Sequence, residues 1–418
     1  MDMYSNYLQL KRRISTMYKN YPLDKILSIK IASIAYKKTT LNFKDVIRLF
    51  RIKNIAIHQN ESKASIFSIG TYGRDDYYQL LDYVEKNTPS ITIDLYKTKY
   101  KYVVNLYNIY FSFREVFSAY HEAKLSFIDK ISLSIDMTSV INTIEHLEKI
   151  DLKAEKVKNF CSFCSNLTGE AELNYFFKNR GVETYTLQHG LWFIYPTPQP
   201  IDALVYENLL ADKILCWGQY TKDEFTRVGI PPDSLLIGGY PRQHSSVLKP
   251  KGKVSKKILI LLARNTYDKN NEQLLNVASA LVPEYEVEYK LHPSLAKEKY
   301  EKICNAKHIM PVRNKTVSEL IAQENYICTI TYNTTAYYDS YVNNCPALRF
   351  IDKDADNSIS VMDDSFTTSD ELKAHLVRLS VDITSDNYWE RVSERLLYIL
   401  GFGIDNYNYF LEGKNEDN

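Results

Sequence analysis

The chain has 418 residues, with 52 Lys and Arg against 51 Asp and Glu, and only six Cys. This length is too great for one hydrophobic core and predicts two domains of about 200 residues each. The balanced charge argues against a nucleic-acid-binding protein, the few cysteines exclude a disulfide framework, and the lack of a signal peptide or membrane-length apolar run predicts a cytoplasmic protein.

The first half is expected to form a Rossmann-like domain over residues 1–246. Short apolar runs predict strands, with helices between several of them, at 65–70, 91–96, 158–165, 183–188, 202–206 and 235–239. The stretch near 101–155 has no strand signal and is predicted to be a helical insertion or layer.

A lysine-rich stretch at 247–257 follows, and a solvated linker is favoured over an anion-binding patch. Beyond it, strands and helices alternate in short units, which is typical of a parallel, doubly wound sheet and predicts a second domain over 258–380. The strands are expected at 257–263, 286–291, 307–312, 326–331 and 346–351. Helices are expected over 381–418, where they could cross back to the first domain.

Candidate chemistry appears first at Gln188, His189 and Gly190, which follow a predicted strand. Ligands of doubly wound sheets bind outside the carboxyl ends of the strands. A histidine there can act as a general base near neutral pH, and a glycine lets the backbone approach a substrate, although an ordinary turn is the alternative. Glu207 ends the 202–206 run and either orients His189 or caps the next segment. Arg74 follows the 65–70 strand and is a candidate contact for an anionic acceptor.

Two further stretches predict a phosphate site in the second domain. His292, Pro293 and Ser294 end a strand beside a helix N-terminus, whose N–H groups and partial positive charge suit a phosphate. A surface His-Pro turn is the alternative.

Polar residues also cluster where the 326–331 strand turns into a helix, at Thr331, Asn333, Thr334 and Thr335. Capping needs only one such residue, so the cluster favours phosphate binding over a simple N-cap. Arg264, which ends the first strand of this domain, is a further candidate contact for donor phosphate.

Other polar stretches favour structural roles. Cys161 and Cys164 lack a second pair and are expected to be buried thiols rather than half of a zinc site. The acidic stretch 352–356 is expected to be a solvated loop rather than a metal site. Lysines and tyrosines alternate in 96–102, where a solvated edge is favoured over a surface for lipid headgroups or an anionic glycan.

Five stretches resemble the bacterial surface-polysaccharide glycosyltransferases of GT-B fold. They are "GVETYTLQHGLW", "YENLLADKILCWGQYTKDEFTRVGI", "LLIGGYPR", "YKLHPS" and "NTTAYYDSYVNNCPALRF". Similar proteins include the capsule Kdo-transferase-like family and, more distantly, bacterial sialyl- and polysialyltransferases, over about 157–352. The resemblance implies an α/β protein of two doubly wound Rossmann-like domains facing across a cleft.

The same resemblance implies roles for single residues. A His-Pro motif that contacts the nucleotide phosphate matches His292 and Pro293, and a Ser/Thr pair that binds phosphate matches Thr334 and Thr335. The group Gln188-His189-Gly190 stands where the sialyltransferase relatives have an acidic pair and a glycine. This departure makes His189 the candidate base.

The predicted function is transfer of a sugar from a nucleotide-sugar donor to a growing capsular or other cell-surface polysaccharide. The expected catalytic residues are His189 and Glu207. The expected acceptor contacts are Gln188, Gly190 and Arg74, and the expected donor contacts are Arg264, His292, Pro293, Ser294, Asn333, Thr334 and Thr335. The other partner is a glycan or lipid-linked oligosaccharide, with peripheral contact at the inner membrane face as an option. No metal, other cofactor or nucleic acid is expected.

Two alternatives stay open. Teichoic-acid polymerases, which transfer glycerol or ribitol phosphate from a CDP-alcohol, also pair a His-Gly element with a His-Pro element. Their first motif continues with Thr, whereas Leu191 and Trp192 follow here. A non-catalytic glycan-binding protein on the same scaffold is the other alternative, and the presence of both histidines and the hydroxyl cluster argues against it. The sugar, the linkage, the stereochemistry and the oligomeric state are not predicted.

Overall fold

A computed structural model describes residues 3–14, 16–37, 39, 41–58, 63–70, 75–87, 90–119, 125–167, 169–191, 209–227, 229–241, 248–250, 252, 255–312, 315–352, 359–401, 407 and 411. The chain divides into two compact units. Unit 1 comprises Met1–Trp217, Thr221–Arg242 and Asp405–Asn418, and unit 2 comprises Gly218–Tyr220 and Gln243–Ile404.

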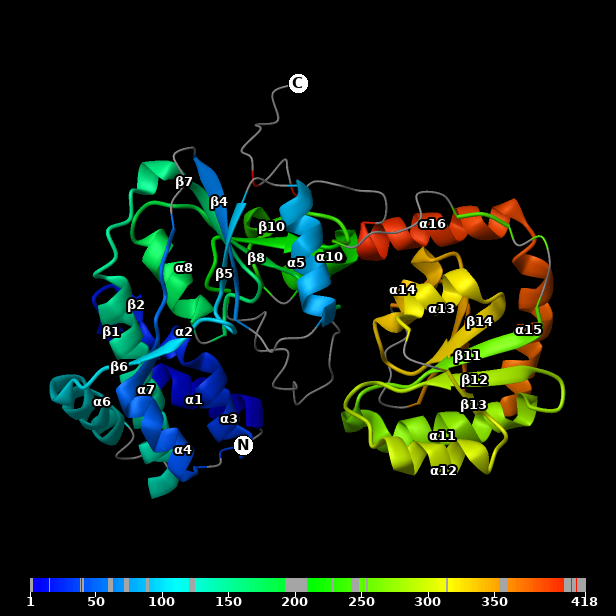
Figure 1. Ribbon diagram of the computed structural model, residues 1–418, viewed down its shortest axis with the longest axis horizontal. Helices are drawn as coiled ribbons and strands as arrows, with labels where there is room; N and C mark the ends of the chain where they lie inside the picture. The colour runs from blue at the N-terminus through cyan, green and yellow to red at the C-terminus, as the bar shows by residue number, and fades with distance from the viewer. Residues whose placement is uncertain are drawn as a thin grey trace. The chain divides into compact units, whose positions relative to one another are not determined.

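Unit 1 is built on a parallel sheet of six strands in the order β10-β9-β8-β7-β4-β5 (Figure 1). The strands are β4 (Ala64–Ile69), β5 (Ser90–Asp94), β7 (Val157–Ser162), β8 (Thr184–Leu187), β9 (Lys213–Cys216) and β10 (Leu235–Ile237). The chain passes outward from β4 to β5 and then continues on the other side of β4 at β7. The winding therefore changes direction between β4 and β7, and such a switch point is where doubly wound sheets bind ligands.

The two faces of this sheet are covered by different helices because side chains alternate along a strand. Ile66 and Phe160 pack in one cluster with side chains of α8 (Glu170–Lys178). Phe67 and Cys161, the next residues along each strand, pack on the other face with side chains of α5 (Asp75–Asn87). Both faces are thus buried, which explains why β4 is apolar or small throughout.

The rest of unit 1 is a helical layer with two small antiparallel pairs of strands. Its helices are α1 (Met3–Arg13), α2 (Leu23–Ile26), α3 (Ser28–Ala35), α4 (Phe43–Val46), α6 (Leu106–Ala119) and α7 (Phe127–Leu147). The pairs are β1 (Met17–Tyr18) with β2 (Tyr21–Pro22), and β3 (Arg51–Lys53) with β6 (Tyr100–Tyr102). Helix α7 is apolar on most of its circumference because it packs against α3, α6 and α8.

Unit 2 holds a second parallel sheet of six strands, in the order β13-β12-β11-β14-β15-β16. They are β11 (Lys257–Leu261), β12 (Glu286–Lys290), β13 (Met310–Pro311), β14 (Tyr326–Thr331), β15 (Ala347–Phe350) and β16 (Ser365–Phe366). The winding here switches direction between β11 and β14.

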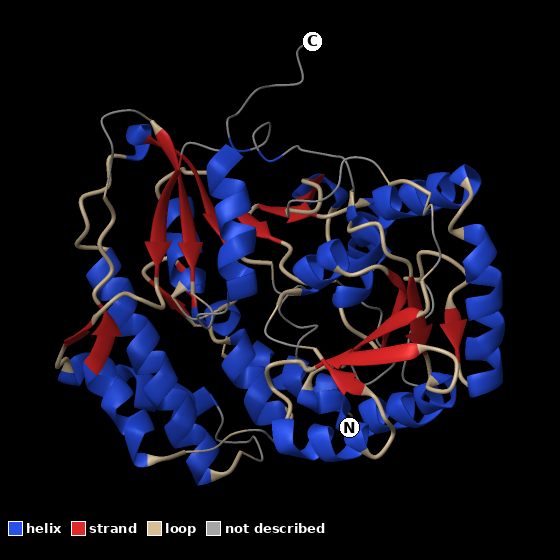
Figure 2. Ribbon diagram, turned by 45° about the vertical axis from the view of Figure 1, so that its right-hand side comes forward, coloured by secondary structure: helices blue, strands red, loops and turns tan. Residues whose placement is uncertain are grey.

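Helices flank the strands of the second sheet as they do those of the first (Figure 2). They are α11 (Asp268–Ala278), α12 (Lys297–Asn305), α13 (Val317–Gln323), α14 (Ala336–Val342), α15 (Ser369–Asp382) and α16 (Asp386–Leu400), while α10 (Gln219–Arg227) begins in unit 2 and continues in unit 1. In Figure 1, α11 and α12 lie on one side of the sheet and α13 and α14 on the other.

The structure confirms the predicted pair of doubly wound Rossmann-like domains. Strand β9 was not predicted, and the expected strand at 202–206 lies outside the described residues. Near the C-terminus, Tyr407 and Leu411 belong to unit 1 and pack on the same sheet face as Phe67. None of the helices in the described ranges is long and apolar enough to span a membrane.

Candidate active site

Most of the polar residues predicted to contact the donor follow three neighbouring strands of unit 2. Arg264 comes after β11, His292 after β12 and Asn333 after β14, and β11 lies between the other two strands. The strands are parallel, so these residues lie at one edge of the sheet, beside the switch point between β11 and β14.

The His292 ring has a defined orientation. Its Nδ1 atom accepts a hydrogen bond from the backbone N–H of Ser294 at 3.1 Å and lies 2.9 Å from the Ser294 hydroxyl. Because a backbone N–H can only donate, the neutral ring carries its proton on Nε2. The half-buried ring therefore carries its N–H on the side away from its own turn.

Hydrogen bonds join the three turns. The Ser294 hydroxyl accepts from the backbone N–H of Asn265 at 3.0 Å, which ties the turn after β12 to the turn after β11. The Asn333 side-chain amide donates to the Tyr267 hydroxyl at 2.9 Å, which ties the turn after β14 to the same segment. Arg264 is exposed and lies over the Tyr267 ring, with its guanidinium carbon 5.6 Å from the ring centroid.

Asn333 has a left-handed backbone, with φ of 38°. This conformation is costly for residues other than glycine, and asparagine is among those that tolerate it best. It turns the chain between the buried end of β14 and the start of α14. Strained positions of this kind concentrate at ligand-binding sites.

The two threonines after Asn333 differ in how their hydroxyls are used. Thr334 accepts a long hydrogen bond of 3.3 Å from the backbone N–H of Ala336. Thr335 is the N-cap residue of α14, yet its side chain makes no capping bond. Both residues are half-exposed, so their hydroxyls lie where a ligand could reach them.

Some details differ from the sequence-based expectation. Helix α12 begins only at Lys297, so a turn separates His292 from the helix N-terminus that it was expected to adjoin. Pro293 and Ser294 are exposed within that turn. Thr331 is fully buried at the end of β14, and its hydroxyl has no hydrogen-bond partner among the described residues.

Asp352 is the described member of the acidic stretch 352–356, and both of its carboxylate oxygens have protein partners. One accepts from the Tyr332 hydroxyl at 3.0 Å, and the other accepts from the Asn270 side-chain amide. Asp354 and Asp356 lie outside the described residues. Within the described ranges, no three His, Cys, Asp or Glu side chains are placed to hold a metal ion together.

In unit 1, Gln188 joins the end of β8 to the end of β9. Its Oε1 atom accepts from the backbone N–H of Trp217 at 2.7 Å, and its backbone carbonyl accepts from the Trp217 indole N–H at 2.6 Å. Its Nε2 atom donates to the carbonyl of Gly190 at 3.0 Å. The side chain is fully buried, so this geometry positions the turn rather than presenting the amide to an acceptor.

His189, held in that turn, is half-buried between aromatic rings. Its ring centroid lies 5.1 Å from that of Phe163 and 6.2 Å from that of Tyr77, which it meets edge-on. A cavity of about 10 Å³ beside it is large enough for about one water molecule. Glu207 and Arg74, expected to act with His189, lie outside the described residues.

Two buried carboxyl groups beside this edge were not predicted. Glu170 accepts from the Ser68 hydroxyl at 2.7 Å and from the backbone N–H groups of Phe163 and Cys164 at 2.8 and 3.2 Å. Burial raises the pKa of Glu170 to about 8, although these hydrogen bonds lower it. Glu170 thereby fastens the loop after β7 to the end of β4.

The second group is Glu172, two residues further along the first turn of α8. Burial raises its pKa to about 7. In the sequence, both residues look like ordinary acids in the first turn of a helix, where they complement the helix dipole. The one available signal was their place directly after a predicted strand.

No family model matches the sequence, and no curated protein matches it. Among solved structures, the chain is similar to the lipopolysaccharide outer core galactosyltransferase WaaB, with a TM-score of 0.49 and 9% identity over 84% of this chain and 100% of that one. It is also similar to S. aureus MnaA bound to UDP, with a TM-score of 0.49 and 15% identity over 84% of this chain and 97% of that one. A third similar structure is a UDP-GlcNAc 2-epimerase from Neisseria meningitidis bound to UDP-GlcNAc. Its TM-score is 0.49, with 10% identity over 84% of this chain and 98% of that one. Likenesses at this level establish neither an activity nor a substrate for this chain.

Proposed function

We propose that the chain is a glycosyltransferase that uses a nucleotide-sugar donor and extends a capsular or other cell-surface polysaccharide. The observation that carries the proposal is the linked set of turns at the carboxyl edge of unit 2. Hydrogen bonds through Ser294 and Asn333 hold these turns together at the switch point. Polar groups gathered at such a point suit the diphosphate of a nucleotide.

In this proposal the donor contacts have distinct roles. The Nε2–H of His292 and the guanidinium of Arg264 bind phosphate oxygens, since charge-assisted and N–H donors suit oxyanions. The hydroxyls of Thr334 and Thr335 bind further oxygens at the start of α14. These donors stabilise the charge on the departing nucleotide, and no metal ion is needed for that step.

The acceptor side is proposed to lie in unit 1. His189 takes the proton from the attacking acceptor hydroxyl, the role of a general base for which histidine is the most common side chain. Gln188 acts indirectly, because its bonds to Trp217 and Gly190 fix the turn that carries His189. Gly190 lets the acceptor approach the backbone. Glu207 is proposed to orient His189, and Arg74 is proposed to contact an anionic acceptor.

A thermal-shift screen tests the donor class. The full chain is heated with UDP-, CMP- and GDP-sugars and with CDP-glycerol, because a ligand that binds only the folded state raises the melting temperature. A nucleotide-sugar that stabilises the protein supports the proposal. Stabilisation by CDP-glycerol alone would instead favour transfer of a polyol phosphate, and stabilisation by none would contradict nucleotide binding.

Two variants then locate the nucleotide. His292→Ala should weaken its binding by about tenfold or more, since a hydrogen bond to a charged group contributes ~1.5–3 kcal/mol. His375→Ala is the matched control. Among the described residues, the His375 ring donates to the backbone carbonyl of Ser365 on β16 and accepts from the guanidinium of Arg378. Calorimetry decides, and equal affinity in the His292 variant and wild type would place the phosphate elsewhere.

A further inference from the structure

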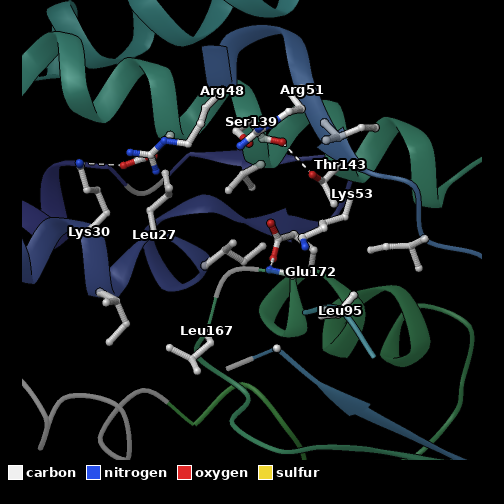
Figure 3. A pocket seen from close by; sticks show the side chains of 18 of the residues that line it. Leu27, Lys30, Arg48, Arg51, Lys53, Leu95, Ser139, Thr143, Leu167 and Glu172 are labelled. Carbon is white, nitrogen blue, oxygen red and sulfur yellow. Dashed lines mark hydrogen bonds and ion pairs between the residues drawn. The ribbon is translucent and has the colours of Figure 1, made fainter. Parts of the chain in front are cut away.

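Unit 1 contains a cavity of about 560 Å³ at the switch point of its sheet (Figure 3). Gly70 after β4, Leu95 at the end of β5, and Leu167 and Gly169 after β7 form its floor. Strands β3 and β6 and helices α2, α3, α7 and α8 contribute further lining residues. This volume is typical of a small-molecule site, and its place is the one where doubly wound sheets bind ligands.

Some charged groups of the cavity are already paired. Lys30 lies 2.8 Å from an oxygen of Asp136, and Arg48 lies 2.6 Å from the other oxygen. Arg48 also pairs with Asp45 at 2.7 Å. These contacts neutralise one end of the cavity and leave a fixed, polar wall there.

Two other cations have no acidic partner among the residues that the structure describes. Arg51 and Lys53 point to the same side of β3 and lie against the ring of Tyr100, at 3.9 and 4.2 Å from its centroid. Lys53 also donates to the carbonyls of Tyr96 and Thr98. Neither cation meets a carboxylate in the described part of the chain, and the Nε of Arg51 is buried there without a hydrogen-bond partner.

Helix α8 contributes to the lining a carboxyl group with one oxygen that has no hydrogen-bond partner among the described residues. Glu172 is fully buried, and its Oε2 accepts from the backbone N–H of Gly169 at 2.6 Å. Its Oε1 is buried and has no partner among the described residues. A buried acceptor without a donor costs about 1–3 kcal/mol, so a ligand that supplies the donor would be favoured.

The glycine before this carboxyl group keeps the cavity in shape. Gly169 has φ of 93°, which other residues rarely adopt, and a Cβ there would lie 2.9 Å from the Cδ1 atom of Leu95. Only glycine therefore lets the loop after β7 enter α8 so close to β5. The Gly169 N–H is thereby directed at Glu172.

We propose that this cavity binds an acidic sugar residue of the acceptor glycan. Arg51 and Lys53 bind its carboxylate or phosphate group, and Glu172 accepts a hydrogen bond from one of its hydroxyls (Figure 3). Leu27, Leu95 and Leu167 pack against the C–H face of the ring. This inference rests on the proposed function and adds a substrate class to it, namely an anionic glycan.

The cavity and the candidate base share one loop. Cys164 and Asn166 line the small cavity beside His189, whereas Leu167 and Gly169 line the large one. Strand β7 lies between β4 and β8 in the sheet, so neighbouring strand ends carry the two places. A glycan held by its acidic residue in the cavity would therefore have a neighbouring residue near His189.

Matched pairs of small sugars test the proposal by calorimetry at pH 7 on the full chain. The carboxylate pair is cellobiouronic acid and cellobiose, and the phosphate pair is glucose 6-phosphate and glucose. At least one acidic probe should bind about tenfold more tightly than its neutral partner, the difference that one charge-assisted hydrogen bond provides. The acidic probe that binds identifies the acidic group.

Variants then assign the binding to the cavity. The double change Arg51→Gln with Lys53→Gln should lower the affinity for the acidic probe by about tenfold or more. Glu172→Gln should lower the affinity for the acidic and the neutral probe alike, while the new amide oxygen still accepts the hydrogen bond from the Gly169 N–H. Arg114→Gln is the control, because Arg114 also lies over an aromatic ring but is exposed outside the cavity. Circular dichroism and melting curves show that each variant is folded.

Three results would overturn the proposal: equal binding of acidic and neutral sugars, no binding of any probe, or full affinity in the double variant. Nucleotide binding is measured in the same samples. A protein that binds nucleotide but no acidic sugar would keep the proposed function and lose this inference. The reverse result would keep the cavity as a sugar site without the transferase.

Discussion

The carboxyl group of Glu172 makes the stability of the protein depend on pH. Burial raises its pKa from an ordinary value of 4.5 to about 7, so the folded chain holds this proton at pH values where the unfolded chain has lost it. Its contribution is therefore fully present below pH 4.5 and is lost as the pH rises through 7. One such group changes the free energy of unfolding by up to about 1.4 kcal/mol per pH unit.

We predict that Glu172→Gln removes this dependence. Relative to the variant, wild type should lose on the order of 3 kcal/mol of unfolding free energy between pH 4.5 and pH 8. Urea titrations of both proteins at several pH values measure the difference, in which the other titrating groups cancel. If the unfolding free energies of wild type and variant changed with pH in parallel, the pKa of Glu172 would be the same in the folded and the unfolded chain.

A second prediction for a single residue is that His189→Ala abolishes transfer and leaves nucleotide affinity nearly unchanged. The base acts on the acceptor hydroxyl, and its loss costs on the order of 10²–10⁴ in rate. The half-buried ring packs on Phe163 and Tyr77, so His189→Phe serves as a control that keeps the packing and lacks the base. Wild-type turnover in either variant would remove His189 from the chemistry.

At the scale of elements, the loop after β15 bears on the question of metal. Divalent ions such as magnesium prefer several oxygen ligands, and both oxygens of Asp352 already accept from Tyr332 and Asn270. We predict that turnover survives EDTA and that Asp352→Asn with Asp354→Asn retains activity. Loss of turnover with EDTA and its return with magnesium would contradict stabilisation of the leaving group by His292, Arg264 and the two threonine hydroxyls alone.

Buried parallel strands were the elements that could be predicted from the sequence. The apolar run 326–331 coincides with β14, because a strand covered on both faces has no polar alternation. Strand β9, with the residues "KILC", was missed although it is no shorter than the predicted strands β8 and β10. Strands β3 and β6 were missed because five of their six residues are Arg, Lys or Tyr, and strands of three residues are too short to show a periodicity.

The two candidate sites also differ in how far they could be predicted from the sequence. Each polar turn of unit 2 follows its own strand, so chain order was enough to predict that Arg264, His292 and Asn333 gather at one edge. The cavity of unit 1 is assembled from strands and helices far apart in the chain. Arg51 and Glu172 are 121 positions apart in the sequence, and no local pattern indicates that they line the same cavity.

At the scale of the whole molecule, the chain returns to unit 1 after completing unit 2. Tyr407 is buried, and its hydroxyl donates to the carbonyl of Gly239 at 2.9 Å. The carbonyl of Leu411 accepts from Ser65 on β4 and Asn159 on β7. These contacts help to cover the sheet face that carries Phe67.

We predict that Tyr407→Ala destabilises unit 1 by about 3–5 kcal/mol, the usual cost of removing a buried aromatic side chain. Tyr407→Phe keeps the ring and should lose only about 1 kcal/mol, for the hydrogen bond. Hydrogen exchange is the measurement, with peptides from β4 and β8 expected to exchange faster and those from β11 and β14 unchanged. Equal acceleration in both units would show that they unfold together.

This return also sets the order of events during synthesis. A ribosome makes the chain from its N-terminus, and a domain generally folds once its residues have left the exit tunnel. Here the first sheet is translated early, but Tyr407 and Leu411 emerge only after all of unit 2. Phe67 and its neighbours therefore stay partly uncovered on the nascent chain, and unit 1 is completed only after unit 2 has been translated.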